Sequence, residues 1–169
     1  MNTIFETNRL LIRELVIEDL PAFHEMQGNP NVMRFVGTPP MTLDENREDL
    51  KKVINAYQNT KSHFNVWASL TKENSFIGTI ALLKNDKEEW EIGYRLLESA
   101  WGNGYGSELT QGLIHYAFNI LNLPSLVAYA DKENKASIYI LNKYMNFINE
   151  FWNKTDQCVD RKYELKNLK

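Results

Sequence analysis

The sequence predicts a mixed α/β (α+β) fold in a single domain that covers residues 1–169. Short runs rich in branched and aromatic residues, typical of strands, alternate with segments in which apolar residues recur every three or four positions, typical of helices. A glycine-rich turn joins one such strand directly to the longest helical segment. At 169 residues, 43% of them hydrophobic, the chain is long enough for one core and too short for two ordinary domains.

The N-terminal third contains one predicted strand and two predicted helices. Residues 9–15 form the strand, and residues 18–21 open the first helix, because their two acids and their proline favour a first helical turn. Residues 27–40 are rich in proline and glycine, so we expect an irregular loop there. Residues 42–45 form a capping box that begins the second helix. The apolar face of this helix consists of Leu50, Val53, Ile54 and Tyr57.

The remainder of the chain contains most of the predicted sheet. A polar turn separates two strand-like runs and predicts a hairpin, and a third strand then leads through the glycine-rich turn into the long helix. Residues 122–124 end that helix, because proline cannot continue it. The predicted strands cover residues 63–70, 75–83, 89–97, 126–130, 147–152 and 158–165, and the last helix covers residues 134–144.

The composition argues against several classes of function. A formal net charge of -3 and a pI of about 5.7 provide no basic excess for binding nucleic acid. Cys158 is the only cysteine and the three histidines are scattered, so we expect no disulfide and no metal site. No run approaches the ~18 apolar residues that span a bilayer, and the N-terminus does not resemble a signal peptide. The simplest interpretation is a cytoplasmic enzyme with no nucleic-acid or membrane partner.

The glycine-rich turn, residues 101–107, is the most informative stretch. Gly102, Gly104 and Gly106 alternate with larger residues, and glycine lets the backbone adopt positive φ angles and approach a ligand closely. The following helix directs its unpaired N–H groups at this turn, so phosphate is the expected ligand. The dinucleotide fingerprint has a different glycine spacing, and the P-loop ends in Gly-Lys-Ser/Thr, which is absent here.

This turn resembles the pyrophosphate loop of the GNAT acetyltransferase superfamily, Gln/Arg-x-x-Gly-x-Gly/Ala. Gly104 and Gly106 take the glycine positions, and Trp101 takes the Gln/Arg position. The ribosomal-protein serine/alanine N-acetyltransferase branch has the pattern Trp-Gly-x-Gly-Tyr-x-x-Glu, which residues 101–108 match. Residues 145–147 depart from the Gly-Phe of that branch. The other stretches similar to it are residues 6–13, 18–19, 29–35 and 134–137.

The resemblance covers about residues 4–147 and implies a GNAT fold with acetyl-CoA as cosubstrate and no metal. Such a fold has a central mixed, mostly antiparallel sheet of about six to seven strands flanked by about four helices, splayed at a bulge in the central strands. Backbone N–H groups of the turn would hold the pyrophosphate, and the central strand would bind the pantetheine arm, with an N–H near Leu96 polarising the carbonyl. The implied cofactor-binding residues are Tyr94, Leu96, Leu97, Trp101, Gly102, Asn103, Gly104, Tyr105, Gly106, Ser107, Asn134 and Lys143.

Glu91 is the candidate general base. Neutralising a lysine amine at pH 7 costs ~4–5 kcal/mol, whereas an α-amine costs only ~1 kcal/mol, so a weak base is sufficient for an α-amine. Glu91 occupies the central-strand position where many superfamily members carry a catalytic carboxylate, which acts directly or through water. The alternative is a solvated strand charge, because Glu88 and Glu89 are its near neighbours.

Ser137 is the candidate acid that protonates the departing thiolate. Many superfamily members use a tyrosine at the position of Leu141, and the ribosomal-protein branch has a serine at the position of Ser137. The alternatives are Tyr139 or Tyr144 as the acid, and for Ser137 a purely local bond from its hydroxyl to the first helical turn. Asn134 is expected both to cap this helix and to contact the pantetheine arm.

We therefore interpret the chain as an acetyl-CoA-dependent N-acetyltransferase. Its acceptor is a primary amine, either a protein N-terminal α-amine of the ribosomal-protein type or a small-molecule amine, and the protein is a monomer or a homodimer. Two other functions remain open: a non-catalytic acyl-CoA sensor that keeps the anion-binding turn, and a nucleotide-phosphate binder. The fold alone does not fix the acceptor.

Overall fold

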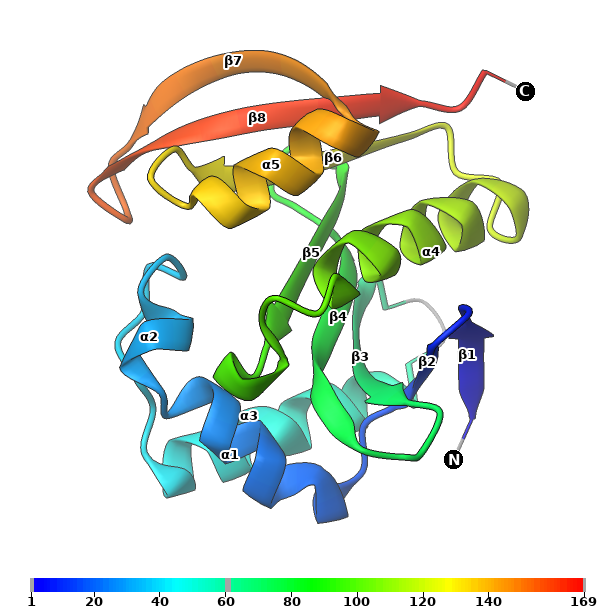
Figure 1. The fold of residues 1–169 in the computed structure, drawn as a ribbon, viewed down its shortest axis with the longest axis vertical. Helices are drawn as coiled ribbons and strands as arrows, with labels where there is room; N and C mark the ends of the chain where they lie inside the picture. The colour runs from blue at the N-terminus through cyan, green and yellow to red at the C-terminus, as the bar shows by residue number, and fades with distance from the viewer. Residues whose placement is uncertain (1, 60–61, 169) are drawn as a thin grey trace.

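The computed structural model describes residues 2–59 and 62–168, and these residues form one eight-stranded sheet. The strand order is β1-β2-β3-β4-β5-β6-β8-β7 (Figure 1). The strands are β1 (Thr3–Glu6), β2 (Leu10–Glu14), β3 (Phe64–Thr71), β4 (Phe76–Lys84), β5 (Trp90–Leu96), β6 (Ser125–Asp131), β7 (Asn146–Asn153) and β8 (Cys158–Lys166).

Five α-helices and two short 3-10 helices connect the strands within the described residues. The α-helices are α1 (Leu20–Gln27), α2 (Pro30–Met33), α3 (Leu43–Ala56), α4 (Tyr105–Asn119) and α5 (Lys135–Tyr144). The 3-10 helices are η1 (Ile17–Asp19) and η2 (Glu98–Ala100). The predicted mixed α/β class is therefore confirmed.

Local capping explains where two of the helices begin. The Thr42 hydroxyl accepts a hydrogen bond from the Glu45 N–H at 3.3 Å, and the Glu45 carboxylate accepts one from the Thr42 N–H at 2.7 Å, which confirms the predicted capping box of α3. The Asn134 side chain accepts from the Ser137 N–H at 3.2 Å and caps α5. Of these two helices, α5 contributes its first residues to the cavity beside the opening of the sheet described next.

The sheet opens between β5 and β6. These two strands are parallel and pair at a single register, Glu91 opposite Val127, whereas every other pair of neighbouring strands is antiparallel. The β4–β5 ladder runs without a register shift from Lys84↔Trp90 to Gly78↔Leu96. The predicted splaying is therefore present on the β6 side of β5, and no bulge interrupts the β4–β5 pairing.

One hydrogen bond fixes which backbone groups of β5 face this opening. The Leu97 N–H donates to the Ile77 carbonyl at 2.9 Å, which makes Leu97 and Ile77 a hydrogen-bonded pair of the antiparallel ladder. Because such pairs alternate, the backbone groups of Tyr94 and Leu96 point away from β4. The strand edge next to the opening therefore presents the N–H and carbonyl groups of Tyr94 and the N–H of Leu96.

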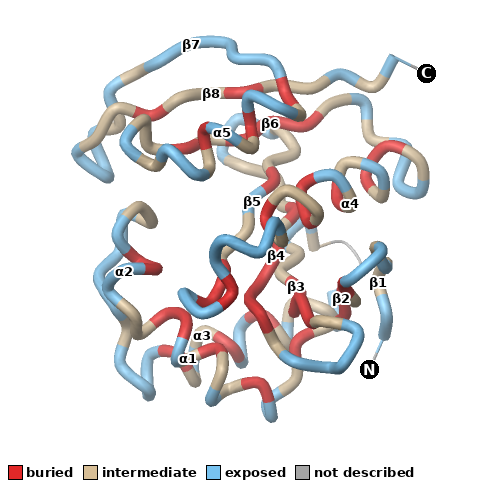
Figure 2. The backbone as a smooth tube through the Cα atoms, in the orientation of Figure 1, coloured by how far each residue is buried: buried red, intermediate tan, exposed pale blue. Residues whose placement is uncertain are grey.

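Side chains of β5 alternate between two helical layers. Tyr94 faces α4, where a Cβ atom on Gly106 would lie 2.9 Å from the tyrosine hydroxyl. Arg95 faces the opposite layer and donates a hydrogen bond to Gln27 of α1. Figure 1 shows α1 and α3 together at the lower end of the view, with α4 and α5 above them. In Figure 2 the buried segments gather in the central strands, while β7 at the sheet edge is mostly exposed.

The structure corrects two details of the predicted fold. The sheet has eight strands rather than six or seven, because β1 adds an edge strand of only four residues, too short to show an alternating pattern. The predicted loop at residues 27–40 contains the single-turn helix α2, which Asn29 caps through its bond from the Asn31 N–H and in which Pro30 takes the first position. This turn raises the number of α-helices in the described residues to five, against about four predicted.

Candidate functional site

A cavity of about 780 Å³ extends from the N-terminus of α4 to the segment that follows α2. Gly104 and Ser107 line its α4 end, and Phe35 lines the opposite end. Gly93 lies between them on β5, and a Cβ atom added there would meet no other atom within 4 Å. The cavity therefore joins the glycine-rich turn to the exposed face of β5.

The glycine-rich turn has the backbone geometry that its sequence predicts. Gly102 and Gly104 have φ angles of 75° and 77°, which residues with a Cβ atom rarely adopt. Gly104 is the N-cap of α4, so the N–H groups of the first helical turn are directed at the ligand side, where they lack intrahelical acceptors. This arrangement suits a pyrophosphate, because N–H groups and the helix dipole both favour an anion.

Gly106 allows α4 to approach β5 closely. A Cβ atom at this position would lie 2.9 Å from Cζ and from the hydroxyl of Tyr94, and 3.1 Å from Cδ1 of Ile140. Those distances are shorter than normal van der Waals contacts, so a larger residue would displace the Tyr94 ring. The third glycine of the turn therefore serves helix packing, while Gly102 and Gly104 serve the backbone conformation.

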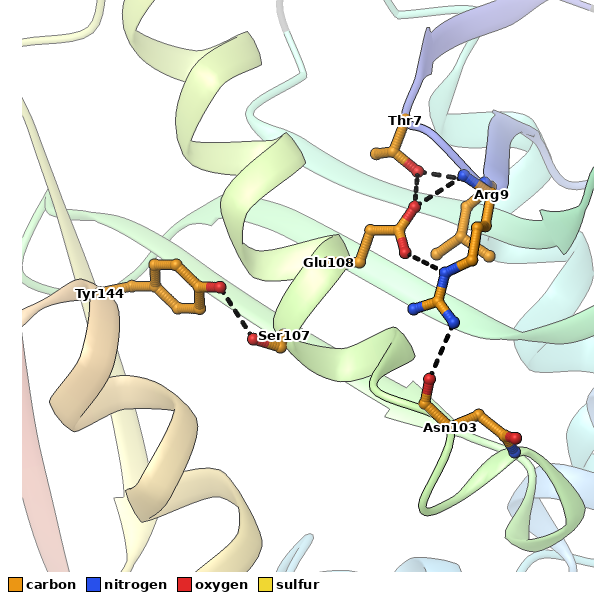
Figure 3. Close-up of polar contacts among 7 residues, drawn as sticks. Thr7, Arg9, Asn103, Ser107, Glu108 and Tyr144 are labelled. Carbon is orange, nitrogen blue, oxygen red and sulfur yellow. Dashed lines mark hydrogen bonds and ion pairs between the residues drawn. The ribbon is translucent and has the colours of Figure 1, made fainter.

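A network from the β1–β2 turn holds the glycine-rich turn in place (Figure 3). The Arg9 guanidinium donates from Nε to Glu108 at 2.6 Å and from Nη1 to the Asn103 carbonyl at 3.0 Å. The Thr7 hydroxyl and the Arg9 N–H donate to the other Glu108 oxygen at 2.6 and 2.8 Å. Arg9 is not among the predicted site residues, although the stretches that contain Arg9 and Glu108 both match the branch pattern.

A second contact in Figure 3 joins α4 to α5: the hydroxyls of Ser107 and Tyr144 lie 2.8 Å apart. This hydrogen bond lowers the pKa of Tyr144. The Lys143 ammonium lies 5.0 Å from the centre of the Tyr144 ring. Tyr144 is thus engaged with the first turn of α4 and does not line the cavity, whereas Ser137 does, so Tyr144 is the weaker candidate for the acid by position.

Ser137 lies on the cavity wall beside Tyr94. Its N–H donates to the Asn134 side chain, so the cap of α5 does not use the serine hydroxyl. Burial raises the pKa of Tyr94, and a hydrogen bond from Ser137 acts in the opposite direction. Ser137 therefore lies close to Tyr94 on the wall of the cavity. Tyr139, the other candidate, is 72% exposed at the rim.

The three neighbouring glutamates have different environments. Lys84 pairs with Glu88 at 3.0 Å. Lys162 pairs with Glu89 and lowers its pKa, with help from the Tyr129 hydroxyl. Within the part of the chain that the structure describes, the Glu91 carboxylate has one hydrogen bond, from the Asn85 side chain at 3.2 Å, and burial raises its pKa. Glu91 is therefore the carboxylate of this group that is best suited to accept a proton near neutral pH.

The structure brings most of the predicted site residues together. Leu97, Asn103 and Lys143 do not line the cavity, and neither does Glu91, which lies further along the same face of β5 as Gly93. The Leu97 N–H already donates to Ile77, and the Trp101 indole donates to the Leu96 carbonyl at 3.2 Å. The predicted residues that line the cavity are Tyr94, Leu96, Trp101, Gly102, Gly104, Tyr105, Gly106, Ser107, Asn134 and Ser137.

Two features of the chain suit coenzyme A. The left-handed glycine turn at the N-terminus of α4 suits its pyrophosphate, and the unpaired edge of β5 suits its pantetheine arm. Among residues 2–59 and 62–168, no three His, Cys, Asp or Glu side chains are grouped so that they could hold a metal ion. No helix in the same described ranges is long and apolar enough to cross a membrane.

Solved structures share this architecture. RimL, a ribosomal L7/L12 α-N-protein acetyltransferase in complex with coenzyme A, superposes with a TM-score of 0.82 and 18% identity, covering 98% of both chains. Spermidine N-acetyltransferase from Vibrio cholerae, in complex with CoA and spermine, gives a TM-score of 0.78 with 19% identity, covering 94% of this chain and 95% of the other. At these identities the likeness concerns the fold.

Sequence comparison establishes the family. The p20 protein of Bacillus licheniformis, an N-acetyltransferase described as uncharacterized, is 33% identical over 146 residues, which cover 84% of this chain and 80% of p20. A family model for the acetyltransferase (GNAT) domain matches residues 9–144. The chain therefore belongs to the GNAT acetyltransferase family.

Proposed function

We propose that this protein transfers the acetyl group of acetyl-CoA to a primary amine. The observation that carries the proposal is the continuous cavity, which connects an anion-binding helix N-terminus to an open strand face at Gly93. When bound, acetyl-CoA supplies a thioester with a transferable acetyl group and a thiolate leaving group. The chain must then hold this cosubstrate, accept a proton from the amine and donate one to the sulfur.

Backbone groups make most of the contacts that bind acetyl-CoA. N–H groups of the first turn of α4 bind the pyrophosphate, and the free N–H and carbonyl groups of Tyr94 bond the pantetheine arm like an added strand. The Leu96 N–H points into the same opening and is suited to polarise the carbonyl oxygen. Asn134 lines the cavity and is available to contact the arm, while Lys143 near the end of α5 adds positive charge.

Two side chains move the protons. Glu91 accepts the amine proton, and because it does not line the cavity it acts through water. Burial raises the pKa of Glu91, which brings it closer to the pH at which a general base is effective. Ser137, which lines the cavity, donates from its hydroxyl to the departing thiolate.

The acceptor is a protein N-terminal α-amine or a small amine. The neighbours support both: RimL is named for a protein α-amine, and the Vibrio cholerae enzyme is named for spermidine. An α-amine costs only ~1 kcal/mol to neutralise at pH 7, which suits a carboxylate that acts through water. The cytoplasmic location, the single domain and the monomeric or homodimeric state stay predictions.

Thiol release from acetyl-CoA with a panel of amines tests this function. An acetyltransferase releases CoA thiol in proportion to the added amine, and Glu91→Gln slows the release. A sensor would bind acetyl-CoA in calorimetry but release no thiol with any amine. A nucleotide-phosphate binder would gain thermal stability from ATP rather than from CoA. Either of the last two outcomes would overturn the proposal.

A further inference from the structure

Two of the six arginines have no carboxylate partner among the described residues, and both line the cavity. Arg34 and Arg95 make no ion pair with any residue in the described ranges, although both contribute to the cavity wall. A guanidinium that remains unpaired beside an apolar cavity is unusual, because desolvated charge is costly unless a partner compensates it. The four other arginines are paired as Arg9–Glu108, Arg13–Asp19, Arg47–Asp44 and Arg161–Glu150.

Arg95 is held in place by neutral groups. Its Nη1 donates to the Gln27 side-chain oxygen. The Gln27 amide in turn donates to Asn46 and to Asp49, each at 3.0 Å, and this orients its oxygen toward Arg95. Asp49, the nearby carboxylate, thus bonds Gln27 and acts on Arg95 only at longer range. Burial lowers the pKa of Arg95, but the group stays charged because arginine does not lose its proton in proteins.

Arg34 lies at the end of the cavity, directly after α2. It is exposed, and its guanidinium lies 5.0 Å from the centre of the Phe35 ring, which leaves its N–H groups available. Glu98 is the carboxylate that contacts this short helix. It accepts hydrogen bonds from Asn29 and Asn31 at 2.8 and 2.9 Å rather than from Arg34. The positive charge of Arg34 is therefore not compensated locally.

The acidic residues on the cavity wall do have local partners. Asp131 and Glu133 line the cavity from the β6–α5 turn. Asp131 accepts a hydrogen bond from the Glu133 N–H at 2.8 Å, and the Glu133 carboxylate lies 3.5 Å from the Lys135 ammonium. The two arginines on the α1 and α2 side of the cavity therefore face no carboxylate on their own side, because both carboxylates of the wall lie on the β6–α5 turn.

We propose that the acceptor is a primary amine that also carries an anionic group, a carboxylate or a phosphate, which Arg95 and Arg34 bind. This inference rests on the proposed acetyltransferase function. The open surface at Gly93 receives the amine, and Arg95 lies two residues further along the same face of β5, a spacing of about 7 Å. Planar guanidinium groups bind carboxylates and phosphates through paired hydrogen bonds, whereas they repel polycations.

Matched acceptors test the proposal in the wild-type protein. Each pair keeps the amine and changes only the charge: β-alanine against β-alaninamide, O-phosphoethanolamine against ethanolamine, and a peptide amide with aspartate as its second residue against one with asparagine. We expect kcat/KM about 10- to 100-fold higher for the anionic member of at least one pair. The basicity of the amine opposes this preference, because the negative charge of the anionic acceptor raises the pKa of its own amine and keeps it protonated. The preferred pair identifies the source of the anion.

Variants then assign the effect to the two arginines. Arg95→Gln and Arg34→Gln should each raise KM for the anionic acceptor about tenfold or more and leave KM for the neutral acceptor and for acetyl-CoA within about twofold. Arg47→Gln, which removes a paired arginine of α3 outside the cavity, should change neither constant. Calorimetric binding of the preferred anionic amine in the presence of CoA, which carries no acetyl group, provides a readout that is independent of turnover.

Two results would overturn the inference. One is a wild-type preference for the neutral members or for spermidine, and the other is an equal loss of anionic and neutral acceptors in the arginine variants. If Arg95→Gln unfolds, Arg34→Gln decides alone, because Arg34 is exposed and has no bonded partner among the described residues. Failure of the proposed function looks different: no amine, charged or neutral, would then release thiol.

Discussion

The Arg9 guanidinium lies 2.6 Å from the Glu108 carboxylate and 3.0 Å from the Asn103 carbonyl, so one side chain from the β1–β2 turn contacts both the glycine-rich turn and the first turn of α4. Arg9 and Glu108 are 99 residues apart in the sequence. A Cβ atom on Gly104 would lie 3.5 Å from Nη2 of the same guanidinium. Arg9 thereby fixes the position of the turn without forming part of it.

Arg9→Gln should weaken acetyl-CoA binding more than it weakens the fold. The arginine side chain is 46% exposed, so screening by water limits the stability loss to about 1 kcal/mol or less. The turn would lose its bond at the Asn103 carbonyl, and we expect about tenfold lower affinity for acetyl-CoA by calorimetry. Arg161→Gln, which removes another partly exposed ion pair on β8, serves as the control. Equal affinity in both variants would contradict the positioning role.

The same ion pair predicts a pH dependence. Burial alone would raise the pKa of Glu108, but the Thr7 hydroxyl and the Arg9 groups outweigh it and lower that pKa below its ordinary 4.5. A lowered pKa means that the unfolded chain binds this proton more readily, so Glu108 stabilises the fold above pH 4.5 and loses this contribution as the pH falls through its folded pKa. The melting temperature of Glu108→Gln should therefore approach that of the wild type in acid and lie below it at neutral pH.

Gly104→Val should abolish acetyl-CoA binding while the protein remains folded. The φ angle of 77° strains any branched residue, and the added side chain would occupy the approach path of the phosphate. Gly93→Ala is the matched control, because a Cβ atom there meets nothing within 4 Å. It should keep the wild-type affinity for acetyl-CoA and change only the KM of the amine. Unchanged affinity in a folded Gly104→Val protein would remove the turn from the binding site.

Local signals in the sequence were sufficient for much of the fold and for the backbone geometry of the glycine-rich turn. The glycine alternation at residues 102–106, the capping box at Thr42 and the N-cap at Asn134 each depend on neighbours within a few positions. The α2 turn carried such signals as well, namely Asn29 followed by Pro30, but the surrounding prolines and glycines obscured them. For four-residue β1 the pattern was too short to detect.

Contacts between distant segments could not be predicted in this way. The Arg9–Glu108 pair and the polar support of Arg95 by Gln27 join segments 99 and 68 residues apart. Nothing in the local sequence separates the roles of Glu89 and Glu91, which depend on Lys162 reaching one carboxylate and not the other. Such assignments require the folded arrangement, because identical residue types differ only in their surroundings.

Glu91→Gln should lower kcat about 100-fold near neutral pH if Glu91 is the general base. The loss should shrink as the pH rises, because the amine then loses its proton without help. Glu88→Gln is the control with a neighbouring carboxylate, which is exposed and pairs with Lys84, and it should leave the shape of the pH profile unchanged. A Glu91→Gln profile parallel to that of the wild type would assign Glu91 to structure.

The pH dependence of the melting temperature provides a second test of Glu91, and the direction of the effect follows from its raised pKa. Burial, together with the charges of Glu89 and Asp160, raises the pKa of Glu91 in the folded state, against a smaller opposing effect of Asn85. The folded protein therefore binds this proton more readily than the unfolded chain, so the contribution of Glu91 is fully present below pH 4.5 and is lost as the pH rises through the folded pKa. Glu91→Gln should melt at a higher temperature than the wild type at neutral pH, and the difference should vanish in acid.

Ser137→Ala should slow turnover and leave both stability and acetyl-CoA affinity nearly unchanged. The cap of α5 uses the Ser137 N–H, which alanine retains, so the loss of the hydroxyl removes no helix-capping bond. Ser137 lies close to Tyr94 on the cavity wall, where we expect its hydroxyl to donate to the departing sulfur, so kcat should fall about 10- to 100-fold in the alanine variant. The effect is modest because a thiol with a pKa near 8.5 is already a fair leaving group. Tyr94→Phe, measured in parallel, separates the two hydroxyls: if it alone lowers kcat while Ser137→Ala turns over normally, Tyr94 replaces Ser137 as the proton donor.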